Sequence, residues 1–306
     1  MVISDYRLNV NYDQRYFGSP EIVRCGSCDL CFARPMPSGE SLADFYGNVY
    51  RDVGRPHFAD PKNPPLPNDR HFSYLSTLTS EIDMRNVHAI LEIGPGSGEI
   101  GFLLLTIFPD LKIYCLEPDE HSQQVLRDRG YTPVSLASQI RGDVDLVMAF
   151  HSLEHFTSID DFFSLFDEKL KPGGNIYLEV PNCPFGDGFD ERPYDSPHLL
   201  FFTPKTLTDA ATRRNLRTID ICTTGHLFAE EFKSARDEQS IYKDWTPGSR
   251  SSKNVKAIVK SALPERVRSL AVDFFRSKSS NSFRFNAYHH LHNHPDSWLI
   301  RAIFQK

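Results

Sequence analysis

Residues 88–101 read His-Ala-Ile-Leu-Glu-Ile-Gly-Pro-Gly-Ser-Gly-Glu-Ile-Gly, an apolar run that ends in a cluster of glycines. The apolar run predicts a buried strand, and the Phe-Leu-Leu-Leu-Thr-Ile-Phe that follows predicts a helix. Glycines let the chain turn sharply between the two and let a ligand lie against bare backbone N–H groups at the helix start. The stretch therefore predicts a ligand-binding loop in a βαβ unit, with a purely structural tight turn as the alternative.

Three further apolar runs predict strands in the same region. They cover 111–117, 145–150 and 175–180, with helical patterns between them, and Ser-Trp-Leu-Ile-Arg-Ala-Ile-Phe-Gln-Lys at the end of the chain predicts a closing strand. Alternation of this kind is typical of a parallel sheet with crossover helices. We therefore expect an α/β, Rossmann-like fold with helices on both faces, and ligands at the carboxyl ends of the strands.

An acidic residue closes the second predicted strand. Glu117, followed by Pro118, lies 23 residues after Gly94, close to the spacing of about 20 residues found in nucleotide-binding βαβ units. A carboxylate at this place can accept hydrogen bonds from the hydroxyls of a ribose. We expect Glu117 to face the glycine loop, although a surface carboxylate by chance is the alternative.

The glycine loop fits two motifs. Gly96, Gly98 and Gly101 follow G-x-G-x-x-G, the dinucleotide-binding fingerprint. The other frame, Glu92-Ile-Gly94-Pro-Gly96-Ser-Gly98, resembles the first motif of class I S-adenosylmethionine (SAM) dependent methyltransferases. The downstream sequence favours the second frame, because three motifs resemble that family. They are Leu-Glu-His at 153–155, a Leu-Lys-Pro-Gly-Gly turn at 170–174 before the strand at 175–180, and Glu-Val-Pro-Asn at 179–182.

The resemblance spans about residues 85–210 and is greatest to the branch that holds nucleotide-sugar C-methyltransferases and related enzymes. The N-terminal segment is similar too. In that branch a cysteine pair is followed by a pattern that this chain matches at Pro35, Pro37, Ser38, Glu40, Leu42, Phe45 and Tyr46. Ser38, Glu40 and the apolar period after them also predict a short helix.

The resemblance implies where SAM would bind. The cofactor would lie over the glycine loop, with its ribose on Glu117 and with the end of the fourth strand near its methionine or adenine portion. The cofactor-binding residues expected on this basis are Glu92, Gly94, Gly96, Gly98, Glu117, Pro118, Phe150 and His151.

Methyl transfer to a carbon or hydroxyl nucleophile also requires removal of a proton, a task that suits histidine. The resemblance carries over three catalytic residues, Glu154 and His155 after the fourth strand and His198 after the fifth, without deciding which histidine is the base. It also implies that Tyr46 and Tyr50 close the acceptor pocket. The alternatives are hydrogen-bonded structural histidines and tyrosines that only pack the N-terminal helix.

Cys25, Cys28 and Cys31 form a cluster in which the resemblance implies a zinc site. Structural zinc takes four ligands, and residues 1–24 contain no cysteine. The fourth ligand could be His57, another chain, or absent, so a metal-free knuckle is the alternative. The histidine-rich run at 289–294 also suggests metal binding, although polar residues are common in a loop before a final strand.

The net charge of −6 divides unevenly along the 306 residues. Residues 232–306 carry 14 Lys and Arg against 6 Asp and Glu, so this part is basic while the rest is acidic. The basic part could contact phosphate groups or an anionic membrane surface, with a solvated helical insertion as the alternative. We expect three parts: an N-terminal Cys-bearing leader and linker (1–69), a SAM-binding core (70–229), and a basic insertion with the closing strand (230–306). Within the first part, the proline-rich residues 51–69 predict an irregular linker.

The composition, 40% hydrophobic and 24% charged, excludes disorder, collagen and a membrane bundle. With no signal-peptide pattern or apolar run of about 18 residues, we expect a cytoplasmic enzyme without a nucleic-acid partner. The expected activity is SAM-dependent methyl transfer to a small or carrier-linked molecule, such as a sugar of a glycan or nucleotide-sugar pathway. The alternatives are an O-methyltransferase with another acceptor, a dehydrogenase, and a non-catalytic SAM- or zinc-binding module.

Overall fold

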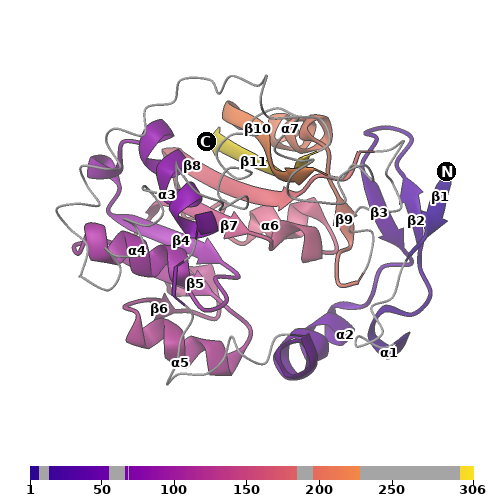
Figure 1. Ribbon diagram of the computed structural model, residues 1–306, viewed down its shortest axis with the longest axis horizontal. Coiled ribbons are helices and arrows are strands. Elements are labelled where there is room, and N and C mark those ends of the chain that lie inside the picture. Colours follow the sequence, from indigo (N-terminus) through magenta and orange to yellow (C-terminus); the bar gives the residue numbers. More distant parts are fainter. Residues whose placement is uncertain (7–13, 55–65, 68, 185–195, 228–296) are drawn as a thin grey trace, which may run out of the picture.

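The computed structural model describes residues 1–6, 14–54, 66–67, 69–184, 196–227 and 297–306 (Figure 1). The described strands form a seven-stranded sheet, in the order β10-β11-β8-β7-β4-β5-β6, and a four-stranded sheet, in the order β1-β2-β3-β9. The large sheet is built from β4 (Ala89–Ile93), β5 (Lys112–Leu116), β6 (Thr132–Pro133), β7 (Val144–Phe150), β8 (Leu170–Pro181), β10 (Arg217–Leu227) and β11 (Ser297–Gln305).

Five neighbouring strands of this sheet, β8, β7, β4, β5 and β6, are parallel to one another. Strand β11 lies between β8 and β10 and is antiparallel to both. The predicted runs at 88–94, 111–117 and 145–150 and the predicted closing strand all become members of this sheet. Because parallel strands end at a common edge, the residues after β4, β5, β7 and β8 lie near one another. That edge holds the residues predicted to bind SAM and the predicted catalytic residues Glu154 and His155.

The start of β8 differs from the prediction. The sequence suggested a turn at 170–174 and a strand only from 175, but β8 already pairs with β7 at Leu170. Val144 of β7 pairs with Leu170 and Leu146 pairs with Asn175, so β8 has extra residues between these two pairs. Within them, Gly173 has a φ of +78°. A glycine in the left-handed region lets the strand bulge and resume its pairing, so the motif is an irregular strand start rather than a separate turn.

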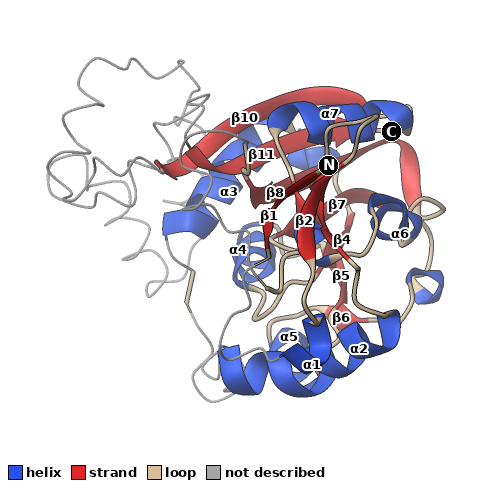
Figure 2. Ribbon diagram, turned by 90° about the vertical axis from the view of Figure 1, so that its right-hand side faces the viewer, coloured by secondary structure: helices blue, strands red, loops and turns tan. Residues whose placement is uncertain are grey.

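Helices cover both faces of the large sheet, as predicted. One face carries α3 (Asp69–Glu81), α4 (Glu99–Ile107) and α5 (Glu120–Asp128), and the other carries α6 (Ile159–Ser164) and α7 (Pro204–Arg213). Figure 2 places α3 and α4 on one side of the strands and α6 on the other. Strand β7 alternates accordingly, because Leu146 and Met148 pack with the first group while Val147 and Ala149 pack with the second.

The N-terminal leader forms its own sheet from β1 (Val2–Asp5), β2 (Glu21–Arg24) and β3 (Cys31–Arg34). Its fourth strand, β9 (Leu200–Phe201), comes from the segment after β8 and pairs with β3. The helices of the leader are α1 (Gln14–Phe17), α2 (Gly39–Asp44) and the π-helix η1 (Phe45–Gly54). The leader is therefore fixed to the chain segment that carries His198.

Two predicted boundaries can be compared with the structure. Helix α2 begins at Ser38, whose Oγ accepts a hydrogen bond from Ser41 N at 3.1 Å, which confirms the predicted helix start. The expected irregular linker at 51–69 is shorter at both ends, because η1 reaches Gly54 and α3 begins at Asp69.

Several expectations fall outside the described residues. They concern His57, the histidine run at 289–294 and most of the basic part at 232–306. Contact of the basic part with a membrane therefore stays a prediction. A search of the described residues finds no helix that is both long and apolar enough to span a bilayer.

Candidate active site

The glycine loop between β4 and α4 presents bare backbone, as predicted. Gly94, Gly96 and Gly98 have φ values of +64°, +61° and +74°, in the left-handed region that glycine tolerates. A Cβ on Gly94 would lie 2.5 Å from Ser152 Oγ. Ser152 follows β7 and donates from Oγ to Ile93 O at 2.8 Å. The loop is therefore closely packed against the segment that precedes the Leu-Glu-His motif.

Glu117 lies against this loop, as its spacing predicted. Its Oε2 accepts a hydrogen bond from Gly96 N at 3.0 Å, and its Oε1 accepts one from Asp119 N at 3.1 Å. Each carboxylate oxygen has more than one acceptor site, so both can also accept from the hydroxyls of a ligand. Pro118 lies between Glu117 and Asp119, and Asp119 caps α5 by accepting from the backbone N–H groups of His121 and Ser122.

The side chain of Glu92 is held in place by a hydrogen bond within the protein. Its side chain is buried, and Oε2 accepts from Tyr131 Oη at 2.6 Å. Burial raises the pKa of Glu92 to about 8, an effect that the hydrogen bond from Tyr131 opposes. Tyr131 packs so closely against α4 that a Cβ on Gly101 would lie 2.0 Å from its Oη. Glu92 thus supports the loop through Tyr131, and direct contact of its side chain with SAM stays a prediction.

Phe150 and His151 end β7 at the same edge. The Phe150 ring stacks on Tyr74 of α3, with centroids 4.1 Å apart and planes 8° apart. His151 has a φ of +55° and lies between two buried carboxylates. Its Nε2 is 3.2 Å from Glu179 Oε1, and its Nδ1 is 3.3 Å from Glu154 Oε1. His151 therefore links the acidic residue of the Leu-Glu-His loop to the adjacent strand β8.

Glu179 is the centre of a buried ion network that the sequence reasoning missed. Arg301 of β11 donates to its Oε2 from Nε at 3.0 Å and from Nη2 at 2.7 Å. Arg70 of α3 donates to its Oε1 from Nε at 3.2 Å and from Nη2 at 2.9 Å, and Tyr74 Oη donates to the same oxygen at 2.5 Å. The sequence does contain a signal for this network, because Glu179 and Arg301 each lie within an apolar run. Buried charges need partners, so the two could have been expected to pair.

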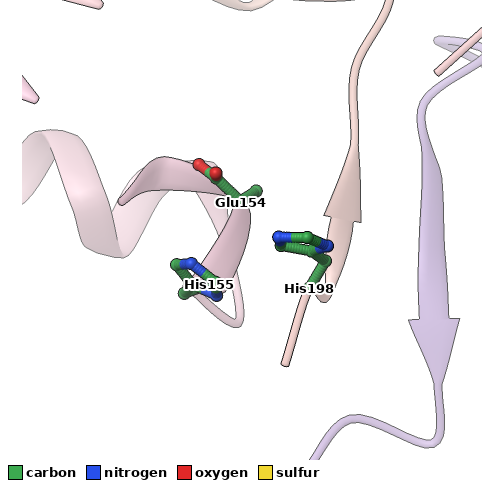
Figure 3. Close-up of side chains that lie close together, drawn as sticks. All are labelled: Glu154, His155 and His198. Carbon is green, nitrogen blue, oxygen red and sulfur yellow. The ribbon is translucent and has the colours of Figure 1, made fainter. Parts of the chain in front are cut away.

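The three predicted catalytic side chains converge. The structure brings together Glu154 and His155, of the short 3-10 helix η5 (Leu153–His155), with His198, and one potential ligand atom of each lies within 4.8 Å of the others (Figure 3). The two imidazole rings stack, with centroids 5.1 Å apart and planes 28° apart. Leu199 N donates to Glu154 O at 2.7 Å, which joins the loop after β7 to the segment before β9.

Glu154 is the buried acid of this cluster. Its side chain has no solvent exposure, and neither carboxylate oxygen has a hydrogen-bond partner in the described residues. Burial raises the pKa of Glu154 to about 7, an effect that the charges of His198 and Arg70 oppose. A carboxyl group with such a pKa can exchange a proton near neutral pH.

The leader flanks the histidine pair. The ring of Tyr46 lies 5.9 Å from that of His155 at an interplanar angle of 70°, and Tyr50 packs on Tyr46 with a centroid separation of 5.2 Å. Tyr6 Oη donates to the backbone carbonyl of His198 at 2.7 Å. Tyr46 therefore lies beside His155, and Tyr50 packs on Tyr46. That the two tyrosines close the acceptor pocket stays a prediction.

The three leader cysteines do not form a metal centre in the described structure. Cys31 is buried on β3, where its thiol donates to Asp29 O at 3.6 Å, and burial raises its pKa to about 12. The hydrogen bond with the Ser27 side chain lowers the pKa of Cys25 to about 6. Among the described residues, the one group of three or more side chains close enough to share a metal ion is Glu154, His155 and His198. The structure therefore does not support zinc at the cysteines.

Comparison with known proteins identifies the family. A protein-family model described as a methyltransferase domain matches residues 65–221, about half of the chain. The chain therefore belongs to this family, which confirms the expectation of a SAM-dependent methyltransferase with the Rossmann-like class I fold. No curated protein has a significant match to the sequence.

Solved structures with a similar fold include several methyltransferases. The plantazolicin methyltransferase BpumL in complex with SAH is 12% identical, with a TM-score of 0.49 over 87% of this chain and 93% of its own. Coclaurine N-methyltransferase bound to N-methylheliamine and SAH is 9% identical, with a TM-score of 0.47 over 77% of this chain and 72% of its own. A SAM dependent methyltransferase from Archaeoglobus fulgidus is 19% identical, with a TM-score of 0.45 over 77% and 94%.

Proposed function

We propose that the protein transfers a methyl group from SAM to a small-molecule or carrier-linked acceptor, a sugar of a glycan or nucleotide-sugar pathway, with a histidine as general base. The observation that carries this proposal is the convergence of Glu154, His155 and His198. They lie at the strand edge that also holds the glycine loop and Glu117.

The donor loop and the proposed base are adjacent. Gly94 packs directly against Ser152, two residues before Glu154, and Glu117 is bonded to the backbone of Gly96. SAM held over this loop with its ribose on Glu117 would have its sulfonium group near the Leu-Glu-His loop. Since the sulfonium already activates the methyl group, the protein needs to align donor and acceptor and to remove the acceptor proton.

His155 is the better placed of the two histidines to take that proton. Its Nδ1 is 3.2 Å from Pro197 O, and a carbonyl can only accept a hydrogen bond, so we assign the proton to Nδ1 and the lone pair to Nε2. The carboxylate of Glu154 in the same cluster would stabilise the imidazolium ion formed after proton transfer. His198 stacks on His155 and would orient the ring or the acceptor.

The leader supports the choice of a sugar. Tyr46 lies beside His155, and its half-buried aromatic ring would give a sugar an apolar face to stack on, while its hydroxyl is buried. A sugar presents apolar C–H faces, so this ring suits it. The resemblance of the leader to that of sugar methyltransferases points to the same acceptor class.

A transfer assay tests the proposal. Purified protein is incubated with methyl-tritiated SAM and a panel of nucleotide sugars, and the label in the sugar is measured. We expect labelling by the wild type and a 10²- to 10⁴-fold fall in kcat for His155→Asn, the usual effect of losing a general base. His121→Gln is the matched control because the side chain of His121 is 83% exposed.

Two outcomes would contradict parts of this proposal. If no nucleotide sugar is labelled while another acceptor class is, the sugar assignment is wrong. If His155→Asn, His198→Asn and Glu154→Gln each keep the wild-type kcat, the base assignment is wrong, even if SAM still binds.

A further inference from the structure

The carboxylate of Glu154 is the buried acidic member of the cluster with His155 and His198. It is fully buried, and neither oxygen accepts a hydrogen bond within the described part of the chain. The Nδ1 atom of His151 lies 3.3 Å from its Oε1. Buried carboxylates are normally hydrogen-bonded, paired with a charge or bound to a metal ion, because desolvation is otherwise costly. A bound divalent cation would supply such a partner.

Two imidazoles complete a donor set around this carboxylate. Potential ligand atoms of Glu154, His155 and His198 lie within 4.8 Å of one another. Bonds of about 2.1 Å to a tetrahedral ion would separate ligand atoms by roughly 3.4 Å, so adjustments of about 1 Å would bring them into coordination. Two neutral imidazoles and a carboxylate suit Zn²⁺ and neighbouring divalent transition metals rather than Mg²⁺ or Ca²⁺.

The surroundings hold these side chains in a suitable arrangement. His155 Nδ1 lies 3.2 Å from Pro197 O, which can only accept a hydrogen bond, so the lone pair is on Nε2. This is typical of metal-binding histidines whose second nitrogen donates to a carbonyl. The backbone is fixed on both sides of the site. Leu199 N donates to Glu154 O at 2.7 Å, and Tyr6 Oη donates to His198 O at 2.7 Å.

We propose that Glu154, His155 and His198 bind one divalent transition-metal ion, such as Zn²⁺, and that the bound ion inhibits methyl transfer. The inhibition rests on the proposed function, because the imidazole lone pair that would coordinate the ion is the one that would accept the acceptor proton. The metal site itself does not depend on that function. Metal binding and proton removal thus compete for one set of atoms.

Metal binding is tested with Zn²⁺ alone on the full-length, EDTA-stripped protein. The parent carries Cys25→Ser and Cys28→Ser, so that leader thiolates do not contribute. Competition with a chromogenic zinc chelator gives the number and affinity of sites. We expect one site in the parent that is lost or weakened at least 10-fold by Glu154→Gln and by His198→Asn, because each change removes a ligand. His121→Gln should leave this site unchanged.

The result that would overturn the metal site is equal stoichiometry and affinity in the parent, Glu154→Gln and His198→Asn. Two variants are used in case one does not fold, and near-ultraviolet circular dichroism identifies such a case. A second readout is Co²⁺ in place of Zn²⁺, because its visible absorption bands report the ligand geometry. Bands that are identical in the parent and in both variants would also contradict the proposal.

The inhibition has its own test. This test uses an acceptor that the transfer assay has identified. EDTA-treated protein should methylate this acceptor, and one equivalent of Zn²⁺ should reduce turnover at least 10-fold. Full activity with the triad occupied by Zn²⁺ would overturn the inhibitory role. Metal binding at the triad without methyl transfer under any condition would contradict the proposed function, while transfer without metal binding would overturn only the metal site.

Discussion

Replacing Arg301 by methionine should be one of the most destabilising single changes in the described protein. Its guanidinium is fully buried, and it donates to Glu179 Oε2 at 3.0 and 2.7 Å. It also donates from Nη1 to Ser73 Oγ at 2.8 Å and to Thr77 Oγ1 at 3.0 Å. Methionine would fill much of the same space but donate no hydrogen bond, so the charge of Glu179 would lose a partner.

The magnitude follows from the remaining partners. Removing one member of a buried ion pair costs about 3–5 kcal/mol. Arg70 still donates to Oε1 of Glu179 at 3.2 and 2.9 Å, and the two hydroxyl groups can turn to other acceptors. We therefore expect Arg301→Met to lower the free energy of unfolding by the smaller part of that range, about 3 kcal/mol.

Urea unfolding followed by circular dichroism at pH 7 measures this change. The matched control is Arg85→Met, because Arg85 pairs with Asp83 at 2.7 Å while its side chain is 86% exposed. An exposed pair of this kind contributes little, so the control should keep the wild-type unfolding midpoint. If the free energy of unfolding of Arg301→Met is within about 1 kcal/mol of the wild-type value, the buried ion pair stabilises the fold less than its geometry implies.

Three further changes have defined outcomes. Gly94→Ala should weaken SAM binding about 10-fold or more in calorimetry, since a side chain at φ +64° is strained by about 1–2 kcal/mol and its Cβ would lie 2.5 Å from Ser152 Oγ; unchanged affinity would contradict the packing. Burial and nearby positive charge lower the pKa of His71 to about 3. As the pH falls below about 6.5, His71 therefore becomes protonated in the unfolded chain but not in the folded protein, so the free energy of unfolding decreases. In urea unfolding at a series of pH values from 7 to 4, the free energy of unfolding should fall less in His71→Gln than in the wild type. The same dependence on pH in both proteins would refute this assignment. A thiol reagent at pH 7 should label Cys25, with its pKa of about 6, long before buried Cys31; equal rates would show that Cys31 is accessible.

The glycine loop and its contact with Glu117 could be predicted because their signals are local. An apolar run, a glycine turn and a helix follow one another at residues 88–107, and Glu117 closes the next strand. Parallel strands end at one edge, so His155 and His198 could be expected to meet there. The structure agrees, although the position of Tyr46 beside them came from family resemblance rather than from any pattern in the residues.

The ion network could not be predicted with the same ease, because it depends on long-range pairing. Glu179 and Arg301 are 122 positions apart and become direct neighbours only when β11 inserts antiparallel beside β8. The pairing of β9 with the leader is also long-range, since Cys31 lies opposite Phe201. The early start of β8 was missed for a local reason, because glycines that suggested a turn instead allow a bulge at Gly173.

Calorimetric titration with SAM, set beside a titration with NAD, tests the central claim most directly. The wild type should bind one SAM per chain and give no heat with NAD. Glu117→Ala should weaken the affinity for SAM about 10- to 100-fold, because it removes hydrogen bonds to a charged carboxylate. Binding of NAD in place of SAM, or SAM affinity that is unchanged in Glu117→Ala, would contradict the account.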